Sequence, residues 1–282
     1  MGSIYFKSIC EPGNKINEDI AFAGKNIGWV LDAATGLTKE KLTSGDSDGA
    51  WFVAQWEEYL KRNTDNMDSS LEDIIYNGIH EVKNKFEDEV KEKKILPVQK
   101  PSASIAIIRI KEKIEYLLIG DCTMLVKYKN EEVQKIKDTL LDKLDKKAIN
   151  EMEKIRKEKN LSFAEAREEI NPMLIKHRCL KNTDDGYWTL EFEEEALKHS
   201  LTGTLKIEEV SEILLLSDGF ASLFESYNYC DEKNIFIENE RVGLEKLYLT
   251  IREIEERDSD ISMFPRFKKG DDASAVYYKI NL

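Results

Sequence analysis

Acidic residues recur in this sequence at the ends of short apolar segments. Asp32 directly follows the mostly apolar residues 27–31, and Asp218 follows residues 213–217 in the same way. Each apolar segment is typical of a short buried strand, so each carboxylate is expected where the backbone leaves the core. A carboxylate in such a place is costly unless it takes up a proton or binds a cation. The pattern therefore points to chemistry that uses acids together with metal ions.

Five acidic residues share this position at the edge of an apolar strand: Glu18, Asp32, Asp121, Asp218 and Asp271. Taken singly, each has a simpler explanation as a turn residue or, for Asp32, as the N-cap at a strand-to-helix turn. If the strands share one sandwich, the acids can meet at one edge, and like charges that meet need compensating cations. The small residues Ala33, Ala34 and Gly36 would leave backbone carbonyls there open to an ion.

The overall composition is typical of a soluble protein with a substantial core. Of the 282 residues, 41% are hydrophobic and 34% are charged, and this length suits one large domain or two small ones. No apolar run approaches the ~20 residues of a membrane-spanning helix, and the first residues lack the basic and apolar regions of a signal peptide. We therefore expect a cytoplasmic protein that does not bind a membrane.

Charge and metal-ligand content narrow the expected function further. The formal net charge of −13 disfavours nucleic-acid binding, because a polyanion would be repelled. The 4 cysteines are scattered without a CxxC pair, which favours reduced core residues over a zinc or redox motif. With 55 Asp and Glu but 3 His, the chain is better suited to hard cations such as Mg²⁺ or Mn²⁺ than to zinc.

Short strands joined by tight turns are predicted on both sides of two helices, and such turns favour antiparallel pairing. The predicted strands are residues 4–9, 20–23, 27–31, 103–110, 114–120, 122–128, 213–217 and 273–280, with 187–190 as a further candidate. The first helix is capped at residues 46–47. A capping box of Ser69 and Glu72 begins the second, whose apolar stripe continues to Val90. A third amphipathic helix is predicted over residues 241–257.

The segment 138–172 differs from the rest because Lys and Glu dominate it. Apolar residues recur in it at helical spacing: Leu144, Ala148, Met152 and Ile155. A capping box of Ser162 and Glu165 is expected to begin a further helix in it, which Pro172 is expected to end. We interpret the segment as a charged helical insertion in a single domain of residues 1–282. Two roles remain open, a solvated spacer helix, which the charge favours, and a mobile lid or docking element for a protein partner.

The order of the acidic motifs resembles that of the metal-dependent type-2C protein phosphatases. The matching segments are Asn17-Glu18-Asp19, the Asp-Ala-Ala-Thr-Gly of residues 32–36, Gly120-Asp121, Ser217-Asp218-Gly219 and Asp271-Asp272 before a final strand. Each segment is common by itself, but five in order, covering the chain outside residues 138–205, are specific. The resemblance implies an α+β fold of two packed antiparallel β-sheets flanked by helices.

The same resemblance implies a site for two Mg²⁺ or Mn²⁺ ions at one edge of the sandwich. Asp32 would bridge the ions, and the backbone carbonyl of Ala33 would bind one of them. Asp218 and Asp271 would hold the other. Two ions roughly 3.5–4 Å apart lower the pKa of a bridging water, and the resulting hydroxide can attack phosphorus in line.

Four further acids take part by the same resemblance, each less directly. Glu18 would act through metal-bound water, while Asp19 and Asp272 would orient the metal ligands. Asp121 would hold a third ion weakly or not at all, because Ser222 replaces the second acid associated with a third metal.

Two other departures from the family pattern affect the expected chemistry. Ala33 and Ala34 stand where the family has glycine and often a general-acid histidine, and the loss of a general acid costs ~10²–10⁴-fold in rate. Asn14 replaces the arginine that is expected to bind the substrate phosphate. Asn14 and Lys15 are therefore the candidate substrate-binding residues, although neither has the two-pronged geometry of a guanidinium.

The leading hypothesis is a Mg²⁺- or Mn²⁺-dependent phosphatase that acts on phosphoserine or phosphothreonine in proteins. A phosphorylated small molecule is the alternative substrate, because the phosphate-binding arginine is missing. A second alternative is a weakly active, phosphatase-like regulatory module that binds a partner through residues 138–172. An aspartyl-phosphate hydrolase based on Asp32 is disfavoured, because Ala34 stands where such enzymes have a second acid.

Overall fold

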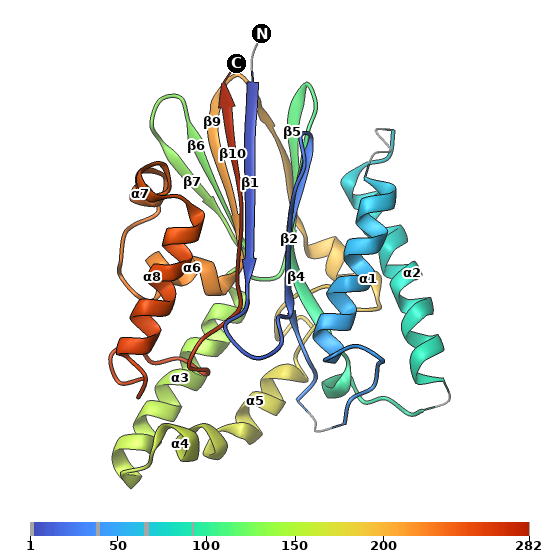
Figure 1. The fold of residues 1–282 in the computed structure, drawn as a ribbon. Coiled ribbons are helices and arrows are strands. Elements are labelled where there is room, and N and C mark those ends of the chain that lie inside the picture. The colour runs from blue at the N-terminus through green and yellow to red at the C-terminus, as the bar shows by residue number, and fades with distance from the viewer. Residues whose placement is uncertain (1–2, 38–39, 65–67, 92, 282) are drawn as a thin grey trace.

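Two five-stranded sheets face each other at the centre of the computed structural model (Figure 1). The structure describes residues 3–37, 40–64, 68–91 and 93–281. The strand order is β1-β10-β9-β6-β7 in the first sheet and β2-β3-β4-β5-β8 in the second. Helices cover the outer faces of both sheets, so the predicted α+β sandwich is confirmed.

Every paired strand within the two sheets is antiparallel to its neighbour, as the short turns predicted. The first sheet consists of β1 (Ser3–Glu11), β10 (Ala273–Asn281), β9 (Val210–Leu216), β6 (Thr123–Tyr128) and β7 (Val133–Ile136). The second consists of β2 (Asp19–Ala23), β3 (Ile27–Ala34), β4 (Ser102–Ile110), β5 (Lys113–Ile119) and β8 (Leu201–Lys206).

The helices form three groups around the sheets (Figure 1). The second sheet is covered by α1 (Asp48–Asn63) and α2 (Leu71–Val90), and the first by α6 (Asp218–Glu225), α7 (Asn234–Val242) and α8 (Leu244–Arg257). The insertion forms α3 (Leu140–Lys159), α4 (Phe163–Glu169) and α5 (Asn171–Arg178) at one end of the sandwich. Two short 3₁₀ helices are η1 (Pro97–Gln99) and η2 (Glu194–His199). Among the described residues, no helix combines the length and apolarity needed to cross a bilayer.

Side chains that alternate along each strand divide the core into layers, and the same alternation determines where Asp32 points. On β3, Trp29 and Leu31 pack against α1 and α2, whereas Val30 packs between the sheets with Val276 of the opposite sheet. Successive side chains of a strand point to opposite faces, so Asp32 shares the inter-sheet face of Val30. The strand therefore carries this carboxylate to the end of the layer between the two sheets.

The helix starts follow the capping pattern, with one shift. Ser47 caps α1, as predicted, and its side chain accepts a hydrogen bond in the first turn. The capping box of α2 consists of Ser70 and Asp73, so the prediction of Ser69 and Glu72 is wrong by one residue. With the cap at Ser70, the apolar stripe of α2 faces the second sheet from its first residue.

Three other elements differ from the prediction. Residues 187–190 are buried but do not form a strand, since the contact of Leu190 with Ala103 is an isolated bridge. The helix predicted over residues 241–257 is two helices, because Gly243 adopts a φ of +83° between them. The strands β7 and β8 were not predicted from the sequence.

The insertion packs as a small core of its own rather than as a solvated spacer. Its buried apolar residues are Ala148, Met152, Ala166, Ile170 and Leu174, and Phe267 of the segment before β10 packs against them. The Ser162–Glu165 capping box begins α4, which ends before Pro172 as predicted. Pro172 also lies in the first turn of α5, so the insertion continues to Arg178 instead of ending at residue 172. Buried apolar contacts therefore attach the insertion to the main fold.

We expect Met152→Ala to lower the free energy of unfolding by about 2–3 kcal/mol, because it removes a fully buried side chain from the core of the insertion. Lys154→Ala on the exposed side of α3 is the matched control and should stay within about 0.5 kcal/mol. Chemical denaturation measures both. Equal, negligible effects would mean that the insertion does not pack as described.

Candidate active site

The two sheets bring acidic residues together at the end of the sandwich next to the insertion. Asp19 on β2 and Asp32 on β3 are register partners in the second sheet. Asp218 begins α6 directly after β9 of the first sheet. Its backbone N–H donates to Oδ2 of Asp32 at 3.4 Å. Acids far apart in the sequence therefore meet across the end of the two sheets.

The turn before β10 holds this end of the sandwich together. A Cβ at Gly219 would lie 2.0 Å from the carbonyl oxygen of Asp272, so only glycine allows α6 to approach this turn so closely. The carboxylate of Asp272 accepts hydrogen bonds from the backbone N–H groups of Gly13 and Glu18, each at 2.8 Å. Asp272 thus fixes the connection between β1 and β2 against the turn that carries Asp271.

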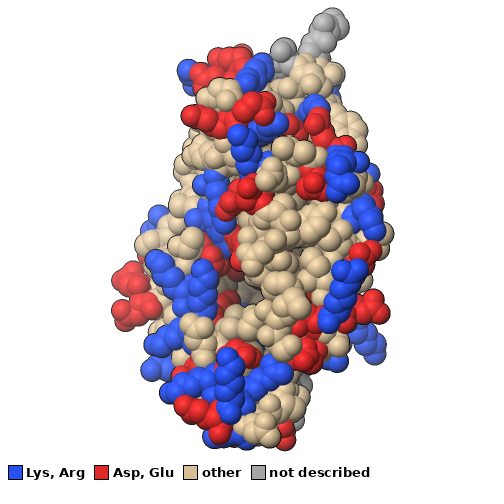
Figure 2. Space-filling model, turned by 90° about the vertical axis from the view of Figure 1, so that its left-hand side faces the viewer, with Lys and Arg blue, Asp and Glu red and all other residues tan. Residues whose placement is uncertain are grey.

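These acids open onto a cavity of about 730 Å³. Its lining includes five of the predicted site residues, Asp32, Ala33, Asp121, Asp218 and Asp271, together with the small residue Ala34. Residues of α3 and α5 form another wall, together with the segment 264–268. Figure 2, which views the face with β7 and the insertion, shows the surface hollowed near its middle between acidic and basic side chains.

Electrostatic repulsion within the acidic group is strong. Burial, followed by the charges of Asp19 and Asp218, raises the pKa of Asp32 well above its usual value. Burial and the charge of Asp271 raise the pKa of Asp218 in the same way. For Asp19, burial and Asp271 raise the pKa to about 7. Its Oδ2 atom is buried without a hydrogen-bond partner among the described residues. The group therefore carries negative charge that protein donors only partly compensate.

Lys268 brings a positive charge into contact with these acids. Its Nζ lies 2.6 Å from Oδ1 of Asp271. Partial desolvation opposes the charged form of this largely exposed lysine, but the charges of Asp271 and Asp218 outweigh this effect and raise the pKa of Lys268. Arg252 of α8 also contacts this turn, because its Nη2 donates a hydrogen bond to the carbonyl oxygen of Asp271 at 2.8 Å.

A second group of acids lies where the insertion meets β5. Oδ1 of Asp121 accepts a hydrogen bond from Oγ of Ser104 at 2.5 Å. On α3, burial raises the pKa of Asp145 to about 7, with further contributions from Asp121 and Asp142. Lys137 pairs with Asp142 at 3.0 Å and partly balances this charge. The insertion therefore adds acids of its own to the cavity wall.

Five residues predicted for the site are not part of the cavity lining: Asp19 and Asp272, described above, and Glu18, Asn14 and Lys15. The carboxylate of Glu18 accepts hydrogen bonds from the hydroxyls of Thr35 and Ser47. Nδ2 of Asn14 donates to a backbone carbonyl in the turn before β10 at 2.9 Å. Lys15 also lies outside the residues that line the cavity. The roles assigned to these residues from the sequence stay predictions.

Sequence reasoning missed the residues that the insertion contributes to the cavity, including His177 and Arg178. Burial, together with Lys147 and Lys176, lowers the pKa of His177. At neutral pH this imidazole is therefore better suited to accept a proton than to donate one. The apolar spacing of the insertion was the one signal available, and it indicates a helix without indicating what the helix faces.

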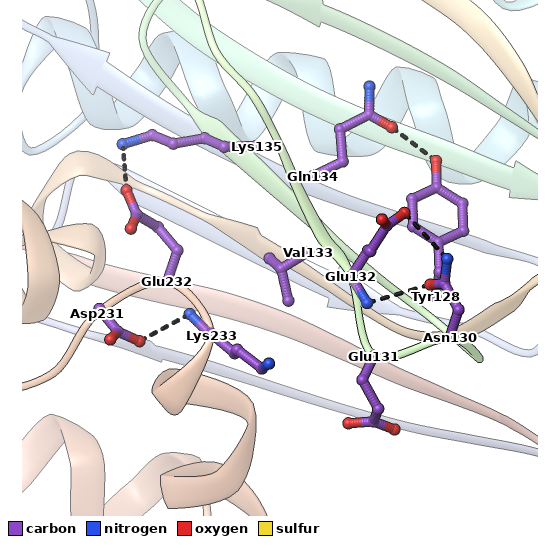
Figure 3. Close-up of a pocket in the computed structure, with 10 residues that line it drawn as sticks. All are labelled: Tyr128, Asn130, Glu131, Glu132, Val133, Gln134, Lys135, Asp231, Glu232 and Lys233. Atoms are coloured by element: carbon purple, nitrogen blue, oxygen red, sulfur yellow. Dashed lines mark hydrogen bonds and ion pairs between the residues drawn. The ribbon is translucent and has the colours of Figure 1, made fainter.

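A second depression, of about 900 Å³, lies beside the β6–β7 hairpin and the start of α7 (Figure 3). Its polar side chains are largely paired with one another. Lys135 contacts Glu232 at 3.5 Å, and the hydroxyl of Tyr128 donates to Gln134 at 2.6 Å. The acidic cavity is the better candidate for chemistry because its charges are not balanced in this way.

The donor atoms of the acidic cavity suit a hard divalent cation, because they are carboxylate oxygens. Over residues 3–37, 40–64, 68–91 and 93–281, no three Asp, Glu, His or Cys side chains are already gathered as a metal-binding cluster. The partnerless Oδ2 of Asp19 and the repulsion between Asp32 and Asp218 nevertheless fit a site whose charge is balanced by a bound cation.

A family model described as protein phosphatase 2C matches residues 13–241. The chain belongs to this family. The matched residues include the acidic segments from Glu18 to Asp218, and Asp271 follows beyond the end of the match. The resemblance inferred from the order of the acidic motifs is confirmed. Among curated proteins, none matches the chain.

Several solved structures share the fold of this family member. The serine/threonine phosphatase PstP/Ppp of Mycobacterium tuberculosis has a TM-score of 0.60 at 15% identity, over 99% of each chain. The PstP catalytic domain in complex with two manganese ions gives 0.54 at 13% identity, over 100% of each. PppA, a regulatory component of T6SS in Pseudomonas aeruginosa, gives 0.56 at 13% identity, over 99% of this chain and 98% of its own.

We expect Asp145→Asn to stabilise this phosphatase-family chain at pH 8 by on the order of 1–2 kcal/mol after solvent screening, and to have no such effect at pH 4. The folded-state pKa of Asp145 is raised from 3.8 to about 7, so the wild type loses stability as the pH rises through that window. Chemical denaturation in chelator measures this difference. Asp184→Asn, at an exposed turn, is the control, and a pH-independent effect of Asp145→Asn would contradict the burial of this acid.

Proposed function

We propose that the chain hydrolyses phosphoserine and phosphothreonine monoesters in proteins, with water activated by two Mg²⁺ or Mn²⁺ ions. Membership of the protein phosphatase 2C family supports the class of reaction. The observation that carries the proposal is the meeting of Asp32 and Asp218, from opposite sheets, at a cavity large enough for a phosphorylated side chain. The PstP structure with two manganese ions supports the choice of cofactor.

Within this proposal, Asp32, Asp218 and Asp271 hold the ions, and the carbonyl of Ala33 is a further ligand. Bound divalent ions supply Lewis acidity and lower the pKa of a coordinated water toward neutrality. Asp19 is the register partner of Asp32 on the neighbouring strand, so its carboxylate helps to orient that ligand. Glu18 takes part through water, and Asp121 holds a third ion weakly if at all.

The rest of the chain positions and shields these groups. Asp272 and Arg252 fix the turn that carries Asp271, so this ligand keeps its place relative to α6. The insertion closes one side of the cavity with apolar residues such as Leu174. Exclusion of water strengthens the electrostatic interactions inside the cavity, which favours attack on a charged phosphate.

A protein substrate is favoured over a small phosphorylated molecule by the composition of the cavity wall. Residues of α3, α5 and the segment 264–268 place acidic, basic and apolar side chains around the acidic centre. Such a wall offers contacts to the residues that flank a phosphorylated side chain, and a small phosphate ester would leave these contacts unused.

We expect the Mn²⁺-loaded protein to hydrolyse p-nitrophenyl phosphate, and Asp32→Asn to reduce kcat/KM by at least about 10³-fold, because metal stabilisation of the transition state is worth several kcal/mol. Asp88→Asn on the exposed face of α2 is the matched control and should retain wild-type activity. Steady-state kinetics in Mn²⁺ and in chelator measure both variants. Activity that persists in chelator would contradict the proposed reaction.

We also expect kcat/KM for a phosphothreonine peptide to exceed that for a sugar phosphate by at least about tenfold, because flanking residues contribute binding energy. Phosphate release from both substrates, at equal Mn²⁺ concentration, provides the comparison. A preference for the sugar phosphate would favour the small-molecule alternative instead. Uptake of Mn²⁺ without turnover of either substrate would favour the regulatory module.

A further inference from the structure

Several basic side chains line the acidic cavity, and three of them, Lys135, Lys137 and Arg266, pair with acids outside the acidic centre. Lys135 and Lys137 both pair with Glu225, at 2.5 and 2.7 Å. Arg266 pairs with Asp258 at 2.5 Å. The partners of these three cations are therefore acids other than Asp32, Asp218 and Asp271. Lys268 differs, because its partner is Asp271 of the acidic centre itself.

The segment that carries Lys268 is firmly built. Asp258, at the end of α8, accepts hydrogen bonds from the backbone N–H groups of Ser262, Met263 and Phe264 at 2.9, 2.8 and 3.1 Å. Arg266 donates to the carbonyl oxygen of Asp258 at 3.1 Å and closes the loop. The backbone before Lys268 is therefore fixed at the rim of the cavity, and the lysine side chain is the part that can move.

The contact between Lys268 and Asp271 is weak as a stabilising interaction. The Lys268 side chain is 53% exposed and that of Asp271 is 33% exposed. Ion pairs with this exposure contribute little to folding. The ammonium group is strongly attracted to the centre only while the carboxylates there keep their negative charge. Neutralisation of these carboxylates by divalent cations removes this attraction and leaves a flexible cation beside the place where a phosphate would bind.

We propose that Lys268 is a substrate-binding residue, whose ammonium group binds the phosphoryl oxygens of the substrate and pairs with Asp271 when divalent cations are absent. This inference rests on the proposed function. A phosphate monoester is a dianion at neutral pH, and a lysine binds it as a mobile point charge without needing bidentate geometry. Lys268 thus gives the cavity a phosphate-binding cation that neither Asn14 nor Lys15 supplies from its position outside the lining.

The proposal predicts effects of opposite sign for metal and phosphate. In the metal-free protein, Lys268 competes with divalent cations for Asp271, so Lys268→Gln should bind Mn²⁺ at least as tightly as the wild type. In the loaded protein, Lys268→Gln lacks a charged hydrogen bond to phosphate, so its affinity for inorganic phosphate should fall about tenfold. A merely structural role would weaken both or neither.

Calorimetric titration tests this with full-length wild type, Lys268→Gln, Lys268→Arg and Lys269→Gln. Lys269 is the matched control, because it is an exposed neighbour on the same segment and lies outside the cavity lining. Each protein is titrated first with Mn²⁺ alone and then, when loaded, with inorganic phosphate. We expect weaker phosphate binding in Lys268→Gln only, with recovery in Lys268→Arg.

Each outcome decides the proposal. Phosphate affinity of Lys268→Gln within twofold of that of Lys269→Gln would overturn it, and the proposed phosphatase function would stand. Weaker Mn²⁺ uptake by Lys268→Gln than by the wild type would also overturn it, because the lysine would then support the metal site instead of competing for it. Failure of the wild type to take up Mn²⁺ would overturn both this inference and the proposed function.

Discussion

Mutual repulsion among clustered carboxylates is the constraint on which the rest of this structure depends. Asp19, Asp32 and Asp218 lie close enough for each to raise the pKa of a neighbour or to have its own raised, and burial adds to this effect. A fold gains nothing in stability from such an arrangement, since each ionised carboxylate costs desolvation energy. A bound cation offsets both the desolvation energy and the repulsion between the carboxylates. The acids are therefore best understood as a binding site that the fold maintains at a cost.

The two-sheet architecture is what makes this arrangement possible. Asp32 ends a strand of one sheet, and Asp218 and Asp271 flank strands of the other, so neither sheet alone could assemble the group. The hydrogen bond from the backbone N–H of Glu18 to the carboxylate of Asp272 then joins the two sheets at this end, and the close contact at Gly219 holds α6 against the same turn. The extended apolar layers behind the acids supply the stability that the site itself removes. Enzymes commonly combine a stable core with a functional site that lowers stability.

Most of this fold and part of the site follow from sequence reasoning. Apolar segments that end in Asp32 and Asp218 predict where strands leave the core, because backbone geometry fixes which residue of a strand is exposed at its end. The role of the insertion at 138–172 could not be predicted, since a narrow apolar stripe looks the same whether it packs beside a cavity or on a distant surface. Lys268 was missed for a similar reason. In the sequence, Lys268 stands next to Lys269 and looks like an ordinary solvent-exposed lysine. Only the fold of the loop after α8 brings its ammonium group to Asp271.

Calorimetric titration of the metal-stripped protein with Mn²⁺, compared with the same titration of Asp218→Asn, tests the central claim most directly. The account predicts that the wild type takes up two ions per chain and that the variant loses at least one of them, while both keep the same far-ultraviolet circular dichroism. Absence of Mn²⁺ and Mg²⁺ uptake by the folded wild type would contradict it, because the clustered carboxylates would then have no divalent cation to balance them.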